Sequence, residues 1–230
     1  MSGFREFEAP ELRFVSTFKT GELVAETGAT LLAEGAHSSH LYTLLSGWAF
    51  RYKLLTDGRR QILNYMLPGD LVGLQGSITG EMDHSVEALS TLVLCVFQRD
   101  RISELFQNHP GLGFDITWLA AREERMLDDH LISLGRRTAV ERAAYLLAFL
   151  HQRAASVGLM PDRSLIIPIT QQHVADTLGL SIVHTNKTLR KLSDRGLIRW
   201  MDRSCEVIDV EGLMDQAAWE GLPEGRRPLI

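Results

Sequence analysis

Residues 181–191, SIVHTNKTLRK, combine hydroxyl, aliphatic, amide and cationic side chains on one short predicted helix. Ile182 and Val183 stand at its start, where exposed positions usually carry acidic or capping side chains. In the major groove of DNA, aliphatic side chains can contact the thymine methyl group, asparagine can bond a base edge, and lysine can reach guanine. We therefore predict that the base-contacting residues are Ser181, Ile182, Val183, Asn186 and Lys187. The alternative, that Ile182 and Val183 pack against their own domain, stays open.

Further polar side chains flank this group at positions suited to the DNA backbone. They are Thr170 and Gln171 at the start of the preceding predicted helix, and Arg190 and Lys191 later on the same helix. Contacts to phosphates fix the register of a protein on DNA without identifying the sequence. We predict that these four residues contact phosphates.

Local signals predict the elements that position these side chains. LIIPIT is a short strand ending at Pro168, Thr170 caps the helix QQHVADTLGL, Gly179 ends it, and Ser181 caps a helix to about Arg195. GLIRW and CEVIDV flank MDRS as a hairpin, which completes a winged helix-turn-helix over residues 136–212. The residues expected to hold its two helices together are Val174, Ala175, Leu178, Leu180, Leu189 and Leu192.

Residues 18–97 are a series of short apolar runs separated by glycines, including the hairpin signal Asp57-Gly58. This pattern predicts an antiparallel, jelly-roll-like β-roll, which we assign to an effector-sensing domain over residues 1–110. The predicted fold class is α+β: the roll, a long dimerisation helix at 111–135 and the C-terminal winged helix-turn-helix. Residues 213–230 form a tail whose Gly and Pro content favours extended chain, with Trp219 and Leu222 available to dock on the wing.

The long helix carries an apolar stripe opposite a charged face, the pattern expected when two helices pair. Packing only within its own domain is the alternative. The helix is expected to end near residues 135–137, with Gly135 as its C-cap, because Thr138 and Glu141 form a capping box for the next helix. The predicted pairing residues are Ile116, Leu119, Ala120, Leu127, Leu131 and Leu134.

Charge is divided unevenly along the chain. The 230 residues carry a net charge of −5, but residues 136–203 hold eleven Lys and Arg against five Asp and Glu, a net of +6, leaving −11 elsewhere. Such asymmetry indicates that one part faces a polyanion. No apolar run is long enough to span a membrane, the N-terminus lacks a signal core, and Cys95 and Cys205 are far apart. We expect a cytoplasmic protein without a disulfide.

Two segments resemble the Crp/Fnr family of bacterial transcription regulators. GRRQILNYMLPGDLVGLQG is similar to the family's cyclic-nucleotide-binding-like roll, and ITQQHVADTLGLSIVHTNKTLRKL is similar to its helix-turn-helix. The resemblance, which covers nearly the whole chain, implies a homodimer paired through the long helix, with one recognition helix in each of two successive major grooves of a near-palindromic site. It also implies that a signal in the roll changes the posture of the DNA-binding domains, and that an activator would contact RNA polymerase.

Departures from the family pattern bear on the effector. Where the cyclic-AMP receptor branch has a ribose-binding Glu and a phosphate-binding Arg-Ser pair, this chain has Leu74, His84 and Ser85. Leucine cannot accept a hydrogen bond, and a neutral histidine replaces a guanidinium. We therefore expect no dependence on cyclic AMP. The resemblance places any effector pocket among Gly73, Leu74, His84, Ser85, Leu127 and Asp128.

Other sensing chemistries differ in the residues they require. An iron–sulfur cluster needs N-terminal cysteines that are absent here. Haem stays open through His37, His40, His84 or His130, while thiol sensing by Cys95 is disfavoured because its apolar run is expected to be buried. Constitutive activity is also open, and we predict no metal or cofactor.

The recognition helix departs from the family as well. Ile182-Val183 replaces the receptor branch's Arg-Glu pair, and Lys187 replaces an Arg. A different half-site sequence is therefore expected. Thr185 and Thr188 stand where the family usually has aliphatic residues, which leaves their packing open.

Two other function classes were weighed against a DNA-binding regulator. A signalling module that uses a cyclic-nucleotide-type roll to bind a small ligand would usually lack the winged helix and the +6 segment. An enzyme is not expected, because the chain has no phosphate-binding loop, nucleophile elbow or zinc-protease motif. No catalytic residue is assigned.

Overall fold

The computed structural model describes residues 4–160, 165–223, 225, 227 and 228, and their contacts divide the chain into two units. The roll unit comprises, of these, residues 4–53, 64–125, 227 and 228. The winged-helix unit comprises residues 54–63 and the described residues of 126–225. The division falls inside the long helix, whereas the sequence suggested separate segments at 1–110, 111–135, 136–212 and 213–230.

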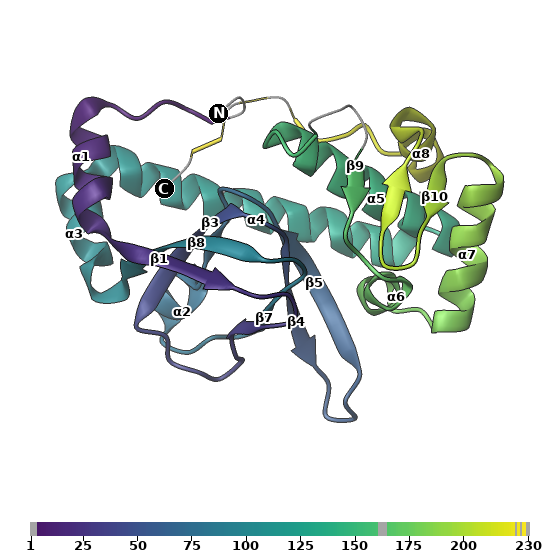
Figure 1. Cartoon of the computed structure of the whole chain (residues 1–230), viewed down its shortest axis with the longest axis horizontal. Coiled ribbons are helices and arrows are strands. Elements are labelled where there is room, and N and C mark those ends of the chain that lie inside the picture. The colour runs from purple at the N-terminus through teal and green to yellow at the C-terminus, as the bar shows by residue number, and fades with distance from the viewer. Residues whose placement is uncertain (1–3, 161–164, 224, 226, 229–230) are drawn as a thin grey trace. The chain divides into compact units, whose positions relative to one another are not determined.

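Two antiparallel four-stranded sheets enclose the core of the roll (Figure 1). One contains, in order, β1 (Lys19–Ala25), β8 (Leu92–Gln98), β3 (His40–Ser46) and β6 (Leu71–Val72). The other contains β2 (Thr30–Leu32), β7 (Ser85–Ala88), β4 (Ala49–Leu54) and β5 (Arg60–Met66). Leu44 and Leu94 of the first sheet and Val86 of the second are fully buried in one apolar cluster. The predicted β-roll is thus confirmed, as is the turn at Gly58, which joins β4 to β5 with φ +84°.

A second apolar cluster lies where helices cover the roll. The helices of this region are α1 (Ala9–Phe18), α2 (Leu74–Thr79), the short 3₁₀ turn η1 (Arg99–Arg101), α3 (Ile102–Asn108) and the first part of α4 (Pro110–Arg136). Ile116 and Leu119 of α4 are buried in this cluster with Phe14 and Phe18 of α1 and Phe97 of β8. The prediction that Ile116 and Leu119 pair with a second chain is therefore wrong, because their side chains form part of the core of their own unit.

Helix α4 ends where the sequence predicted, but Gly135 is not its C-cap. It runs for 27 residues, about 40 Å, and Thr138 and Glu141 form the expected capping box of α5 (Ala139–Ser156). Gly135, expected as a C-cap, instead lies inside α4 without a positive φ. The Arg137 amide still donates to the Ser133 carbonyl at 3.2 Å, so the helix needs no left-handed glycine before the next cap.

The winged-helix unit follows the predicted order of elements (Figure 1). After α5 come β9 (Leu165–Ile167), α6 (Gln171–Leu178), α7 (Ile182–Asp194), β10 (Ile198–Trp200), β11 (Cys205–Val207) and α8 (Val210–Ala217). The three strands form an antiparallel sheet in the order β10-β11-β9. Helix α5 is buried without a break from Ala143 to Leu150, so it forms the centre of this unit.

The C-terminal residues are held at two places. Helix α8 crosses the boundary expected at residue 212, and Trp219 lies edge-on to Tyr145 of α5 with ring centroids 5.2 Å apart. The Leu222 amide donates to Gln152 of α5 at 2.7 Å. Trp219 and Leu222 therefore contact α5, whereas the sequence suggested that they dock on the wing. In the roll unit, buried Arg227 forms an ion pair with Asp70 at 2.7 Å.

Candidate nucleic-acid interface

The first helix of the helix-turn-helix begins with a capping box that uses histidine in place of an acid. The Thr170 hydroxyl accepts from the His173 amide at 3.2 Å, and His173 Nδ1 accepts from the Thr170 amide at 3.1 Å. Burial and nearby Arg60 lower the pKa of His173 to about 4, so the ring is neutral near pH 7 and its unprotonated nitrogen can accept. This cap fixes the first residue of α6.

The turn between the two helices depends on Gly179. It ends α6 in the left-handed conformation, with φ +63°, which costs a glycine little. Ser181 then caps α7 by accepting from the His184 amide at 3.3 Å. The predicted helix-turn-helix is confirmed in its start, its turn and its second cap.

One face of α7 holds it to the domain. Leu189 and Leu192 are buried, as are Val174 and Leu178 of α6. Thr185 and Thr188 are also buried, which answers how these positions pack. Thr185 Oγ1 has no hydrogen-bond partner within the described part of the chain.

The opposite face of α7 is free. Ser181, Ile182, Val183, Asn186 and Lys187 are all exposed, Val183 to 61% and Ile182 to 40%. The alternative that these two aliphatic side chains pack inside their own domain is therefore wrong. Their contact with bases stays a prediction.

The residues predicted to contact phosphates lie on both helices of the helix-turn-helix. Thr170 and Gln171 are half-buried at the start of α6, where backbone amides of a helix favour anions. Arg190 and Lys191 are exposed in the last two turns of α7, and Arg190 lies 3.9 Å from Asp194 across one helical turn. An exposed pair at this distance contributes little, so Arg190 can exchange its carboxylate for a phosphate.

Helix α4 leaves a different apolar face exposed from the one expected. Phe114, Trp118, Leu131 and Ile132 are exposed, Phe114 to 69% and Leu131 to 70%. Leu127, Leu131, Leu134 and Ala120 of the predicted stripe are exposed or half-buried, unlike Ile116 and Leu119. Steps of four and three residues join the apolar Phe114, Trp118, Ala121 and Ile132 by way of the charged Arg125 and Asp128. Apolar residues at such steps favour helix pairing, and this series was not part of the predicted stripe.

Family models match both halves of the chain. Residues 22–109 match the cyclic nucleotide-binding domain, and residues 141–216 match the Crp-like helix-turn-helix domain. The nitrogen fixation regulation protein FixK of Bradyrhizobium diazoefficiens is 33% identical over 184 residues, which cover 80% of this chain and 76% of that protein. The chain belongs to the Crp/Fnr family.

Other similar proteins agree with this placement. The transcriptional activatory protein AadR of Rhodopseudomonas palustris is 32% identical over 78% of this chain and 74% of its own length. The solved structure of FixK2 from Bradyrhizobium japonicum has the same fold, with a TM-score of 0.74 at 24% identity, covering 89% of this chain and 98% of that one. This Crp/Fnr protein is a DNA-binding transcription regulator, and its relatives are transcription regulators and not enzymes.

The residues expected to form the Crp/Fnr effector pocket are divided between the two units. Gly73, Leu74, His84 and Ser85 lie in the roll unit, while Leu127 and Asp128 lie on the part of α4 in the winged-helix unit. Gly73 precedes α2 with φ +92°, Leu74 packs against the second apolar cluster, and the Ser85 hydroxyl accepts from the Glu34 amide at 3.0 Å. His84 is only 7% exposed, and its burial, together with Arg51, lowers its pKa to about 4.

Sequence reasoning did not find a polar network inside the roll unit. Arg51 of β4 forms an ion pair with Glu123 of α4, and the same carboxylate oxygen accepts from Asn64 of β5 at 2.7 Å. A polar Asn64 within the apolar run of β5 was the available signal. The Arg51 guanidinium and the Asn64 amide are thus both bound to the carboxylate of Glu123.

The candidate haem ligands have protein contacts. His130 Nδ1 lies 2.9 Å from the Tyr145 hydroxyl, and His37 lies 3.5 Å from Glu81, while His40 is exposed. Within residues 4–160, 165–223, 225, 227 and 228, no three His, Cys, Asp or Glu side chains are grouped as metal ligands. Cys95 is buried, which raises the pKa of its thiol, and Cys205 is likewise a free, buried cysteine. No helix of the described residues is long and apolar enough to cross a membrane.

Proposed function

We propose that this regulator acts as a homodimer that identifies a near-palindromic DNA site through α7. The observation that supports this most strongly is the free face of α7, where Ile182 and Val183 are exposed beside Asn186 and Lys187. An exposed aliphatic pair next to an amide and a cation suits an operator that presents thymine methyl groups next to hydrogen-bonding base edges. Thr170, Gln171, Arg190 and Lys191 then hold the register through phosphates.

In this proposal the dimer forms through α4. The exposed apolar side chains of Phe114, Trp118 and Ile132 need a partner, and a second copy of the same helix supplies the same residues in return. The 4-3-4-3 spacing supports side-by-side packing of two such helices. Leu127 and Leu134, from the stripe expected at first, are not part of this spacing.

We further propose that DNA binding does not depend on cyclic AMP, haem or an iron–sulfur cluster. A cyclic phosphate would meet buried, neutral His84 in place of a guanidinium, and Ser85 already accepts a backbone hydrogen bond. Arg51, a cation near His84, is already paired with Glu123. A signalling role without DNA has less support, since the chain combines a Crp-like helix-turn-helix with an exposed α7 face.

The names of the relatives favour activation of transcription over repression. AadR is called a transcriptional activatory protein, and FnrL of Cereibacter sphaeroides a transcriptional activator protein. On this basis we propose that the DNA-bound dimer contacts RNA polymerase. In the absence of a ligand that changes its affinity for DNA, the concentration of the regulator in the cell controls transcription.

The test is selection of binding sites from randomised duplexes, with the wild-type protein and Val183→Glu compared. Glutamate can accept from the cytosine amino group, so the variant is expected to move the preference at one position of each half-site from thymine to cytosine. Val24→Glu, an equally exposed valine of the roll unit, is the matched control and leaves the selected sequence unchanged. The same preference for both variants would contradict base contact by Val183.

The dimer and the effector are tested separately. Sedimentation of the wild-type protein should give twice the chain mass of 25.8 kDa, and Ile132→Asp should shift it towards monomer. Adding cyclic AMP at millimolar concentration should leave the DNA dissociation constant unchanged. A strictly monomeric wild type contradicts the dimer, and a tenfold effect of cyclic AMP contradicts independence of cyclic AMP.

A further inference from the structure

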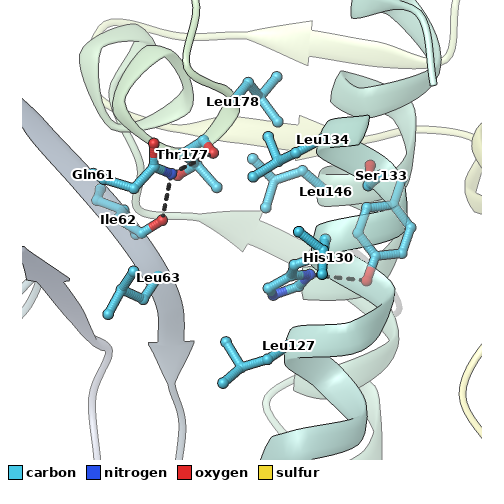
Figure 2. Close-up of a pocket in the computed structure, with 12 residues that line it drawn as sticks. Gln61, Ile62, Leu63, Leu127, His130, Ser133, Leu134, Leu146, Thr177 and Leu178 are labelled. Carbon is cyan, nitrogen blue, oxygen red and sulfur yellow. Dashed lines mark hydrogen bonds between the residues drawn. The ribbon is translucent and has the colours of Figure 1, made fainter. Parts of the chain in front are cut away.

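An apolar pocket lies within the winged-helix unit, beside the helix-turn-helix (Figure 2). Its walls come from β5, α4, α5 and α6, and its volume is about 180 Å³. Leu63 and Ile62 face Leu127 and His130 across it (Figure 2). None of these walls belongs to the DNA-contacting surface of α7.

The lining contains no acidic or strongly basic side chain that could hold an ion. Twelve residues line the pocket, and none of them is Lys, Arg, Asp or Glu. Most of its polar side chains already have partners: Gln61 Nε2 donates to the Ile62 and Thr177 carbonyls at 3.0 Å, and His130 Nδ1 lies 2.9 Å from the Tyr145 hydroxyl. A charged ligand, such as a nucleotide, would lose its hydration here without gaining a counter-ion.

The volume sets the size of a suitable ligand. An apolar cavity of about 150 Å³ in a protein stays dry and binds benzene, so about 180 Å³ is enough for one six-membered ring with a substituent. Ligand pockets in general combine an apolar lining with a few polar groups that fix orientation.

Ser133 supplies one such polar group. Its side chain lines the pocket and is buried, with the residue 2% exposed, and its Oγ has no hydrogen-bond partner within the described residues. A buried hydroxyl without a partner is costly, and a hydroxyl or carbonyl group on a ligand would satisfy it.

We propose that this pocket binds a small neutral molecule, one ring in size, that carries a single hydroxyl or carbonyl group. The site also couples such a ligand to DNA binding, because Thr177 and Leu178 of its wall are the last residues of α6. Only the turn at Gly179 separates them from α7. A ligand that holds these residues against β5 favours one placement of α6 over others, and so changes the affinity of α7 for DNA.

Binding is tested by thermal unfolding of the full chain with cyclohexanol as the probe. Cyclohexanol should raise Tm in a saturable way, while cyclohexanecarboxylate, which has the same ring and a charge, should not. Leu63→Phe narrows the pocket and should abolish the rise; Leu54→Phe, an exposed leucine outside the lining, should preserve it. Ser133→Ala, which is expected to fold, should weaken the apparent affinity about fivefold.

Coupling is tested by gel shift with the selected DNA at saturating cyclohexanol. The DNA dissociation constant should change at least fivefold, with the same dependence on concentration as Tm. No rise in Tm, or an equal rise in Leu63→Phe, overturns the site. A rise in Tm with an unchanged DNA dissociation constant overturns the coupling alone, and neither result bears on whether α7 binds DNA.

Discussion

The free face of α7 and the interior of the roll use polar side chains in opposite ways. Asn186 and Lys187 are exposed and have no hydrogen-bond partner within the described residues, so a ligand outside the chain can supply one. In the roll, Arg51 and Asn64 share the carboxylate of Glu123. The first arrangement leaves its polar groups open to a ligand, whereas in the second Glu123 already pairs with both side chains, and an incoming anion would have to displace it.

The largest expected effect comes from removing the polar side chains of α7. The double variant Asn186→Ala, Lys187→Ala should lose about 2–6 kcal/mol of specific binding, since each good base contact contributes about 1–3 kcal/mol. Gel shifts with the selected site and a scrambled duplex measure this loss. Lys53→Ala, an exposed lysine of the roll unit, should bind as the wild type does, and an equal loss there would mean that general charge and not base contact is responsible.

The next effect concerns pH and the buried imidazole of His84. Its pKa in the folded chain, about 4, is below the ordinary value of 6.5, so the unfolded chain binds more protons between these values. The resulting stability, about 3 kcal/mol, is fully present above pH 6.5 and is lost as the pH falls through 4. His84→Asn should lessen the slope of the unfolding free energy against pH in that window, measured in urea, and leave the part that is due to His173. The exposed control His40→Asn should keep the wild-type slope.

Glu123→Ala tests the network inside the roll directly. It leaves a mostly buried guanidinium at Arg51 and the amide of Asn64 without their shared acceptor, which should cost about 2 kcal/mol of unfolding free energy. The neighbouring Glu124 is exposed, so Glu124→Ala should change stability by less than about 0.5 kcal/mol. Equal effects for the two variants would show that the roll does not depend on this carboxylate.

The smallest expected effect is an increase in stability. Thr185→Val keeps the shape of a fully buried side chain and removes a hydroxyl without a partner, so it should stabilise the winged-helix unit by about 1 kcal/mol. Chemical denaturation followed by circular dichroism measures the change. Destabilisation by Thr185→Val would show that the hydroxyl has a role in the folded protein.

Local signals made the elements of the winged helix predictable, but they did not show which face of α4 packs against its own chain. Thr138, Thr170, Gly179 and Ser181 act on backbone groups within a few residues, so their roles follow from the sequence and the structure repeats them. Helix α4 has apolar residues on two faces, and periodicity cannot say which face meets its own chain. Ile116 was assigned to the wrong face because the aromatic side chains of α1 that cover it are about a hundred positions away in the sequence.

Contacts over long separations were equally hidden. Arg51 and Glu123 are 72 positions apart, and nothing in either neighbourhood of the sequence predicts their pairing. The exposure of Val183 was predictable only because the inward residues of α6 and α7 could be assigned first. Sequence patterns therefore located the exposed face of α7 well and the contents of the roll poorly.

The ion pair between Asp70 and Arg227 has a consequence for how the protein is made. The two residues are 157 positions apart, so a ribosome adding about 5–20 residues per second needs roughly 8–30 s between them. Once Arg122 has been translated, this cation, 3.7 Å away in the finished structure, can pair with the carboxylate before Arg227 is made. The half of the chain synthesised first thus obtains its final buried charge partner only after the DNA-binding half has been translated.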